Sequence, residues 1–196
     1  MKKVFILHRW SGVPESDWYP WLGAELEKGN EPFEVVVPEM PNTDTPIIEE
    51  RVEFLKNLVG IPDENTFFIA HSIGAQTVMH FFETLPEDAK VGGAIFVAGW
   101  FNLGGIILEE GDDVQALAKP WTETPIDFGK VKSVCPNISV FLSSDEPYDY
   151  LAENKKIFEE KLGAKVTILE NRGHFTEDDG VKEIPEVLAE FLEMAK

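Results

Sequence analysis

Ser72 stands where an apolar run of strand length meets a helical pattern, within TFFIAHSIGAQTVMHFFETL at residues 66–85. Its neighbours two positions away on either side are Ala70 and Gly74. A sharp strand-to-helix turn requires small residues there, because it gives the serine a strained backbone that bulky neighbours would obstruct. Two interpretations follow: Ser72 is a nucleophile lifted clear of a sheet, or it is the N-cap of the following helix.

His174 is the histidine best placed to activate a serine hydroxyl, which is a poor nucleophile without a base. It lies in LENRGHFTED, between the last predicted strand and the last predicted helix, and Gly173 permits a tight turn there. The alternative for His174 is a solvated loop residue. Of the other histidines, we expect His71 and His80 to have packing or structural roles, and His8 to shape the floor of the site.

Asp145 is the first acid after the apolar run in VFLSSDEPYD, and we expect it to orient His174. Glu146 or Asp149 could take this role instead, and Asp145 could be only a turn residue. Ser72, Asp145 and His174 follow the ends of separate predicted strands, in the chain order of an α/β-hydrolase triad. Together they predict acyl transfer through a serine nucleophile, a histidine base and an orienting carboxylate.

The elements that must hold these residues alternate along the chain. We expect strands at residues 4–7, 33–38, 66–70, 93–98, 138–143 and 166–169, and helices at residues 18–28, 47–59, 75–85, 150–162 and 184–194. The strands are continuous apolar runs, as in a buried, mostly parallel sheet with helices on both faces. Residues 101–132 have weak periodicity, and we expect an irregular excursion with a short helix, whose position relative to the site stays open.

Length and charge limit the remaining possibilities. The 196 residues fit a single domain over residues 1–196, and the formal net charge of −19 argues against nucleic acid and anionic membrane as partners. No apolar run approaches the roughly 20 residues of a membrane span, and MKKVFIL fits a first strand better than a signal peptide. The single cysteine, Cys135, fits a reducing compartment, so we expect a cytoplasmic protein. No acidic cluster has ligand spacing, so no metal or other cofactor is expected.

Four stretches resemble the small, lid-poor serine hydrolases of the α/β-hydrolase superfamily that are typified by retinoblastoma-binding protein nine. They are ILHRWSGVPESDWYPWL, IAHSIGAQ, VCPNISVFLSSDEPY and NRGHF, of which HSIGA and SSDEPY are the most telling. The resemblance covers nearly the whole chain and implies a compact fold with no large lid domain, and a triad of Ser72, Asp145 and His174. The chain departs from the family at Ala70, where elbows usually have glycine, and at Arg9, where many relatives have glycine after histidine.

The same architecture suggests the rest of the site. The backbone N–H groups of Ile73 and of Trp10 or Arg9 are expected to bind an oxyanion. The residues expected to line a substrate pocket are His8, Arg9, Trp100 and Trp121. The expected substrate is a small carboxyl ester or a peptide-like amide, with the oligomeric state left open. Two alternatives are a protein-binding module on a hydrolase fold with weak or no catalysis, and an acyltransferase that shares the triad.

Overall fold

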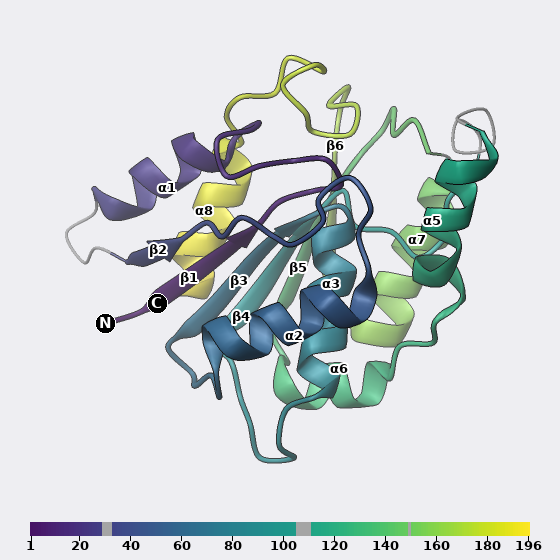
Figure 1. Ribbon diagram of the computed structural model, residues 1–196. Helices are drawn as coiled ribbons and strands as arrows, with labels where there is room; N and C mark the ends of the chain where they lie inside the picture. The colour runs from purple at the N-terminus through teal and green to yellow at the C-terminus, as the bar shows by residue number, and fades with distance from the viewer. Residues whose placement is uncertain (29–32, 105–110, 149) are drawn as a thin grey trace.

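The computed structural model describes residues 1–28, 33–104, 111–148 and 150–196 of the chain (Figure 1). Its strands are β1 (Lys3–Leu7), β2 (Glu34–Val36), β3 (Thr66–His71), β4 (Gly93–Val97), β5 (Ile138–Ser143) and β6 (Lys165–Leu169). Its helices are α1 (Tyr19–Glu27), α2 (Ile48–Val59), α3 (Ile73–Glu83), α5 (Asp112–Glu123), α6 (Phe128–Val134), α7 (Leu151–Ile157) and α8 (Pro185–Met194). A π-helical segment, η1 (Phe158–Leu162), continues α7.

The strands form one six-stranded sheet in the order β2-β1-β3-β4-β5-β6, and every pair in it is parallel. The chain moves outward from β1 to β2, and then returns to β3 on the other side of β1 and continues to β6. The boundary between β1 and β3 is therefore a topological switch point, where α/β sheets bind ligands beyond the carboxyl ends of their strands. The segments that follow β1 and β3 meet at this point.

Strand β3 lies in the middle of this arrangement and is buried along its whole length. Its side chains alternate between the two faces of the sheet. Phe68 and Ala70 pack into the hydrophobic cluster that includes α3, whereas Phe67 and Ile69 pack into the cluster that includes α1 and α8. Burial on both faces explains why the strand is a continuous apolar run in the sequence.

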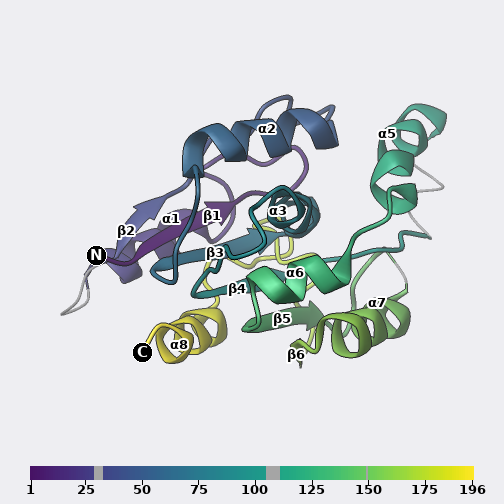
Figure 2. The same cartoon turned by 90° about the horizontal axis from the view of Figure 1, so that it is seen from below.

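Helices cover both faces of the sheet. The hydrophobic cluster on one face includes residues of α2, α3, α6 and η1, and the cluster on the other face includes residues of α1 and α8. Figure 2 shows α2 and α3 on the side of the sheet opposite to α8. None of the helices in the described ranges has both the length and the apolar content needed to cross a bilayer.

The alternation of strands and helices predicted this architecture correctly, and no lid domain covers the described part of the sheet. Each expected strand is present, with ends that differ by at most two residues. The helix expected at residues 150–162 is divided into α7 and η1, and the expected mostly parallel sheet is parallel throughout.

Residues 101–132 differ most from the expectation, because they contain α5 and the start of α6 rather than one short helix. Only Ala118 and Trp121 of α5 are buried, so little of this helix packs into the core. Pro120 lies inside α5 and weakens the helical signal. Asp112 and Asp113 occupy its first turn, where the helix dipole favours carboxylates.

Replacing Phe68 with alanine should test how much the centre of the sheet contributes to stability. The ring of Phe68 is fully buried and lies 5.5 Å from the ring of Phe5 and 5.2 Å from that of Phe82, measured between centroids. We expect Phe68→Ala to lower the free energy of unfolding by about 3–5 kcal/mol, because it leaves a cavity. Urea denaturation measures the change.

Ile61→Ala is the control for this substitution, because the side chain of Ile61 is 75% exposed. Its free energy of unfolding should stay within about 0.5 kcal/mol of the wild type. Similar losses for the two variants would contradict the central packing role of Phe68.

Candidate active site

The backbone at Ser72 makes the sharp turn that the sequence suggests. Ser72 follows the last residue of β3 directly, precedes the first residue of α3, and has φ 54° and ψ −122°. A Cβ atom on Gly74 would lie 3.0 Å from the carbonyl oxygen of Leu7, so the position after the serine has little room for a side chain. Ser72 occupies the N-cap position of α3, but its side chain makes no capping hydrogen bond. The hydroxyl is therefore free to face another partner.

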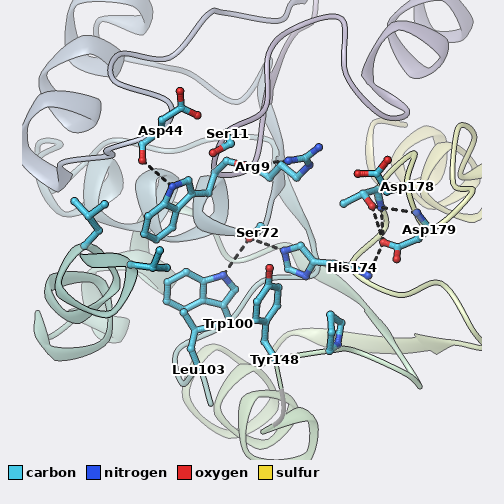
Figure 3. Close-up of a pocket in the computed structure, with 15 residues that line it drawn as sticks. Arg9, Ser11, Asp44, Ser72, Trp100, Leu103, Tyr148, His174, Asp178 and Asp179 are labelled. Atoms are coloured by element: carbon cyan, nitrogen blue, oxygen red, sulfur yellow. Dashed lines mark hydrogen bonds between the residues drawn. The ribbon is translucent and has the colours of Figure 1, made fainter. Parts of the chain in front are cut away.

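That partner is His174, in the loop between β6 and α8. The Oγ atom of Ser72 lies 2.8 Å from Nε2 of His174, and Nδ1 of His174 lies 2.7 Å from Oε1 of Glu146 (Figure 3 shows the first contact). All three side chains are largely shielded from solvent. A carboxylate only accepts hydrogen bonds, so Nδ1 carries a proton towards Glu146 and Nε2 is left to accept the hydroxyl proton.

Glu146, and not Asp145, contacts His174, which corrects the expected geometry. Oδ1 of Asp145 accepts hydrogen bonds from the hydroxyl of Ser143, at 2.5 Å, and from the N–H of Gly173, at 2.9 Å. These two hydrogen bonds hold the pKa of Asp145 below its usual range, and the bond from Ser143 has the larger effect. Asp145 is exposed and braces the turn before His174, whereas the side chain of the next residue points inward. The third candidate acid, Asp149, lies outside the described residues.

Two features of the His174 loop explain its fixed position. Gly173 has φ +52°, which glycine adopts without strain, and a Cβ atom there would lie only 2.3 Å from Cγ of Asp179. Oδ2 of Asp179 accepts the backbone N–H groups of His174, at 2.9 Å, and of Thr176, at 3.0 Å. The imidazole therefore stands on a turn that is hydrogen-bonded from within.

A second donor, the indole of Trp100, also contacts the serine hydroxyl. Nε1 of Trp100 donates to Oγ of Ser72 at 3.1 Å, and the side chain is almost fully buried (Figure 3). Trp100 follows the carboxyl end of β4. This position is the reason that the sequence predicted Trp100 near the site. The sequence did not indicate that its N–H would point at the hydroxyl of Ser72.

A buried chain of hydrogen bonds connects the loop after β1 with the loop that carries His174. The N–H of Arg9 donates to Oη of Tyr19 at 3.1 Å, and Oη lies 2.7 Å from Nδ1 of His71. Nε2 of His71 lies 2.7 Å from the carbonyl oxygen of His174. Because that carbonyl can only accept, Nε2 of His71 carries the proton, and Tyr19 donates to Nδ1. Sequence analysis missed Tyr19, since its position in α1 looks like that of any core aromatic.

The side chain of Arg9 is paired within the protein. Its Nε and Nη2 atoms lie 2.8 and 3.3 Å from the two carboxylate oxygens of Asp17, whose side chain is fully buried. The backbone N–H of Arg9 is occupied by Tyr19, as described above. Of the two amides considered for the oxyanion after β1, this leaves the N–H of Trp10 as the candidate.

The pocket above Ser72 has a volume of about 490 Å³. Its apolar walls are Trp10, Trp100, Leu103, Val114, Leu117 and Tyr148. Val114 and Leu117 belong to α5, so the segment whose position the sequence left open contributes to the pocket wall. Asp44, Asp178 and Asp179 lie at exposed positions around it (Figure 3). The pocket is thus apolar inside and acidic at its rim.

Two of the four expected pocket residues do not line the pocket. Arg9 and Trp100 line the pocket, whereas His8 and Trp121 are not among its lining residues. His8 is buried, with Nδ1 2.8 Å from the carbonyl oxygen of Arg9 and Nε2 accepting the N–H of Met40 at 3.0 Å. Trp121 is also buried and donates its indole N–H to a main-chain carbonyl of the loop before α2. Both side chains are held by hydrogen bonds to main-chain groups.

Metal ligands are not gathered in the described ranges, where no three His, Cys, Asp or Glu side chains are placed to hold an ion.

The sequence matches a known protein family over nearly its whole length. The family model for serine hydrolases matches residues 4–193 of the chain. The chain belongs to the serine hydrolase family. This confirms the resemblance read from the elbow and from the strand ends, and it agrees with the contact between Ser72 and His174.

Two curated relatives and one solved structure show how far the similarity extends. YdeN from Bacillus subtilis is 26% identical over 94% of this chain and 91% of its own length. The serine hydrolase RBBP9 from Rattus norvegicus is 28% identical over 83% of this chain and 80% of its own length. The crystal structure of the B. subtilis ydeN gene product matches with a TM-score of 0.87 and 25% identity, and covers 99% of this chain and 98% of the other.

The buried histidines beneath this serine hydrolase site should make its stability depend on pH. Burial lowers the pKa of His8 to about 4 and lowers that of His71 well below its usual value. Both pKa values are lower in the folded chain than in the unfolded chain, so at these two rings it is mainly the unfolded chain that takes up protons as the pH falls below 6.5. The free energy of unfolding should therefore decrease between pH 6.5 and 5, by up to about 1.4 kcal/mol per pH unit for each ring.

Urea denaturation at several pH values measures this slope. A His8→Asn variant, which lacks one of the two titrating rings, should show a shallower slope than the wild type over the same interval. Equal slopes would mean that His8 is able to bind a proton in the folded protein.

Proposed function

We propose that this serine hydrolase cleaves small carboxyl esters, or peptide-like amides, through an acyl-enzyme on Ser72. The observation that carries the proposal is the 2.8 Å contact between Oγ of Ser72 and Nε2 of His174, at the base of an apolar pocket. The strained turn at Ser72 and the carboxylate of Glu146 behind His174 support it. We also propose a cytoplasmic location, because the single cysteine, Cys135, fits a reducing compartment.

Acylation begins with the proton of the serine hydroxyl. Nε2 of His174 takes this proton while Oγ of Ser72 attacks the carbonyl carbon of the substrate, and the Glu146 carboxylate stabilises the imidazolium that forms. The tetrahedral intermediate then collapses, and His174 protonates the departing alcohol or amine. The product that stays behind is an ester between the acyl group and Ser72.

The oxyanion of the tetrahedral intermediate needs hydrogen-bond donors that are already in place. The N–H of Ile73 is one proposed donor, because the first N–H groups of a helix have no acceptor within it. The N–H of Trp10 is the other, since Arg9 gives its N–H to Tyr19. The positive end of the α3 dipole adds to the stabilisation of the negative charge.

Deacylation repeats these steps with water as the nucleophile. His174 takes a proton from the water molecule, the hydroxide adds to the acyl carbon, and the bond from that carbon to Oγ breaks. A proton from Nε2 then restores the serine hydroxyl. The apolar walls suit an aliphatic or aromatic acyl group, and the three rim carboxylates disfavour anionic substrates.

Removal of the nucleophile or the base tests the triad directly. Ser72→Ala and His174→Ala should each lower kcat for p-nitrophenyl acetate by roughly 10³-fold or more, and the double variant should be little worse than either single variant. A fluorophosphonate probe should label the wild type and not Ser72→Ala. Ser139→Ala is the matched control. Ser139 is also a buried serine, but it lies at the amino end of β5, away from the site, and its hydroxyl donates to Glu190.

Two results would contradict this proposal. A wild-type protein that neither reacts with the probe nor turns over esters would favour the protein-binding alternative. Transfer of the acyl group to an added alcohol or amine in preference to water would identify an acyltransferase instead.

Exchange of each neighbouring acid for its amide distinguishes their roles. Glu146→Gln should lower kcat by roughly 10³–10⁴-fold, as the loss of the orienting carboxylate does in other serine hydrolases. Asp145→Asn should cost less than about 10-fold, because this residue only braces the turn before His174. Steady-state kinetics with an activated ester measures both changes, and a larger loss for Asp145→Asn would reverse the assignment.

A further inference from the structure

The indole of Trp100 is aimed at the reacting oxygen of the site, and the triad mechanism assigns it no role. Its N–H donates to Oγ of Ser72 at 3.1 Å, while Nε2 of His174 lies 2.8 Å from the same atom. Figure 3 shows the indole and the imidazole approaching Ser72 from different directions. Only 5% of the surface of Trp100 is exposed, so water does not compete freely for this contact.

The main chain around Trp100 is held by buried polar groups. Nε2 of Gln76, on α3, donates to the carbonyl oxygen of Trp100 at 2.9 Å. Oδ1 of Asn154, on α7, accepts the N–H groups of Phe101 and Asn102 at 2.9 and 3.0 Å. Gln76 and Asn154 are both buried. Two helices thus fix the segment that carries the indole.

The backbone before Trp100 is also adapted to this position. Ala98 has φ 48°, a left-handed conformation that is uncommon for a residue with a side chain. A Cβ atom on Gly99 would lie 2.9 Å from Cζ of Phe158 and 3.2 Å from Cβ of Ala75. Glycine at this position lets the chain pass close to α3 and bring the indole to the serine.

The chemistry of the indole fixes the direction of both hydrogen bonds. An indole N–H can only donate, so Oγ of Ser72 accepts from Trp100. The proton of the hydroxyl is then directed to Nε2 of His174, which is the arrangement that proton transfer requires. In the resting enzyme, Trp100 therefore orients the serine hydroxyl.

We propose that Trp100 is a catalytic residue that stabilises the charge developing on Oγ of Ser72 when the acyl-enzyme breaks down. The inference rests on the proposed hydrolase function. In this step water has added to the acyl carbon, and the bond between that carbon and Oγ breaks. The electron pair goes to Oγ, which takes a proton from Nε2 of His174, and the acyl group leaves as a carboxylic acid. The indole N–H donates to Oγ throughout.

The effect should be larger for deacylation than for acylation. In the acyl-enzyme, Oγ is an ester oxygen and a weak acceptor, and it becomes a strong acceptor as the bond to carbon breaks. In acylation, Oγ begins as a hydroxyl that already accepts from Trp100, so the hydrogen bond changes less on the way to the transition state. Only an interaction that strengthens in the transition state accelerates a step.

Stopped-flow kinetics with p-nitrophenyl acetate separates the two steps. Trp100→Phe should lower the deacylation rate constant by about 10- to 100-fold, the usual value of a hydrogen bond to a charged oxygen, and the acylation rate constant by less than about 3-fold. The burst of p-nitrophenol should then approach one equivalent of enzyme, and intact mass measurement should find acetylated protein. Trp21→Phe, on the other face of the sheet, should leave both constants within about 2-fold of the wild type.

A closer analogue removes the N–H without changing the shape of the side chain. Benzothienylalanine at position 100, introduced by codon suppression, replaces the indole nitrogen with sulfur and should reproduce the selective loss of deacylation. It also keeps the proposal testable if Trp100→Phe does not fold. An analogue with wild-type rate constants, or a fall of equal size in both steps, would overturn the inference and leave the hydrolase proposal intact.

Nuclear magnetic resonance gives a measurement that does not depend on turnover. The indole N–H resonance of Trp100, assigned by its loss in Trp100→Phe, should move upfield in Ser72→Ala because its acceptor is gone. An unchanged resonance would overturn the inference. Absence of any ester turnover by the wild type would overturn the hydrolase proposal, and the role of Trp100 with it.

Discussion

The backbone at Ser72 is the constraint on which the site depends. Its left-handed φ of 54° belongs to a class of conformations that cost about 1–3 kcal/mol and persist only when the surrounding structure holds them. Strand β3 is paired on both sides, and α3 is buried along most of its length, so neither end of the turn is free to relax. A relaxed turn would let the hydroxyl cap α3, whereas the strained turn directs it to His174.

The site also requires that segments far apart in the sequence keep fixed positions relative to one another. Tyr19 and His71 hold two of these segments together, because their hydrogen bonds connect the N–H of Arg9 with the carbonyl oxygen of His174. His71 is itself the last residue of β3 and precedes Ser72 directly. The loop after β1, Ser72 and His174 are thereby placed relative to one strand. Burial of these polar groups is tolerated because each has a partner.

Much of the fold could be predicted because its signals are local. Residues 66–70 and 138–143 are buried on both faces of the sheet. A continuous apolar run is therefore enough to predict a strand at these positions. The elbow was also local, since the small residues Ala70 and Gly74 stand beside Ser72 in the sequence. The sequence predicted only a short helix in the segment that contains α5, because Pro120 lies inside this helix and proline usually interrupts one.

The sequence by itself determined the order of the strands and of most helices, because periodicity and residue size act over a few positions. It predicted the turn at Ser72 and the approach of His174 only as one of two interpretations, since their contact joins segments that are about 100 residues apart. The tertiary structure decided that Glu146 faces the imidazole while Asp145 turns to Ser143 and Gly173. It also decided that the indole N–H of Trp100 reaches Oγ of Ser72. Adjacent residues in a loop point in different directions, and those directions are set by contacts with segments that are distant along the chain.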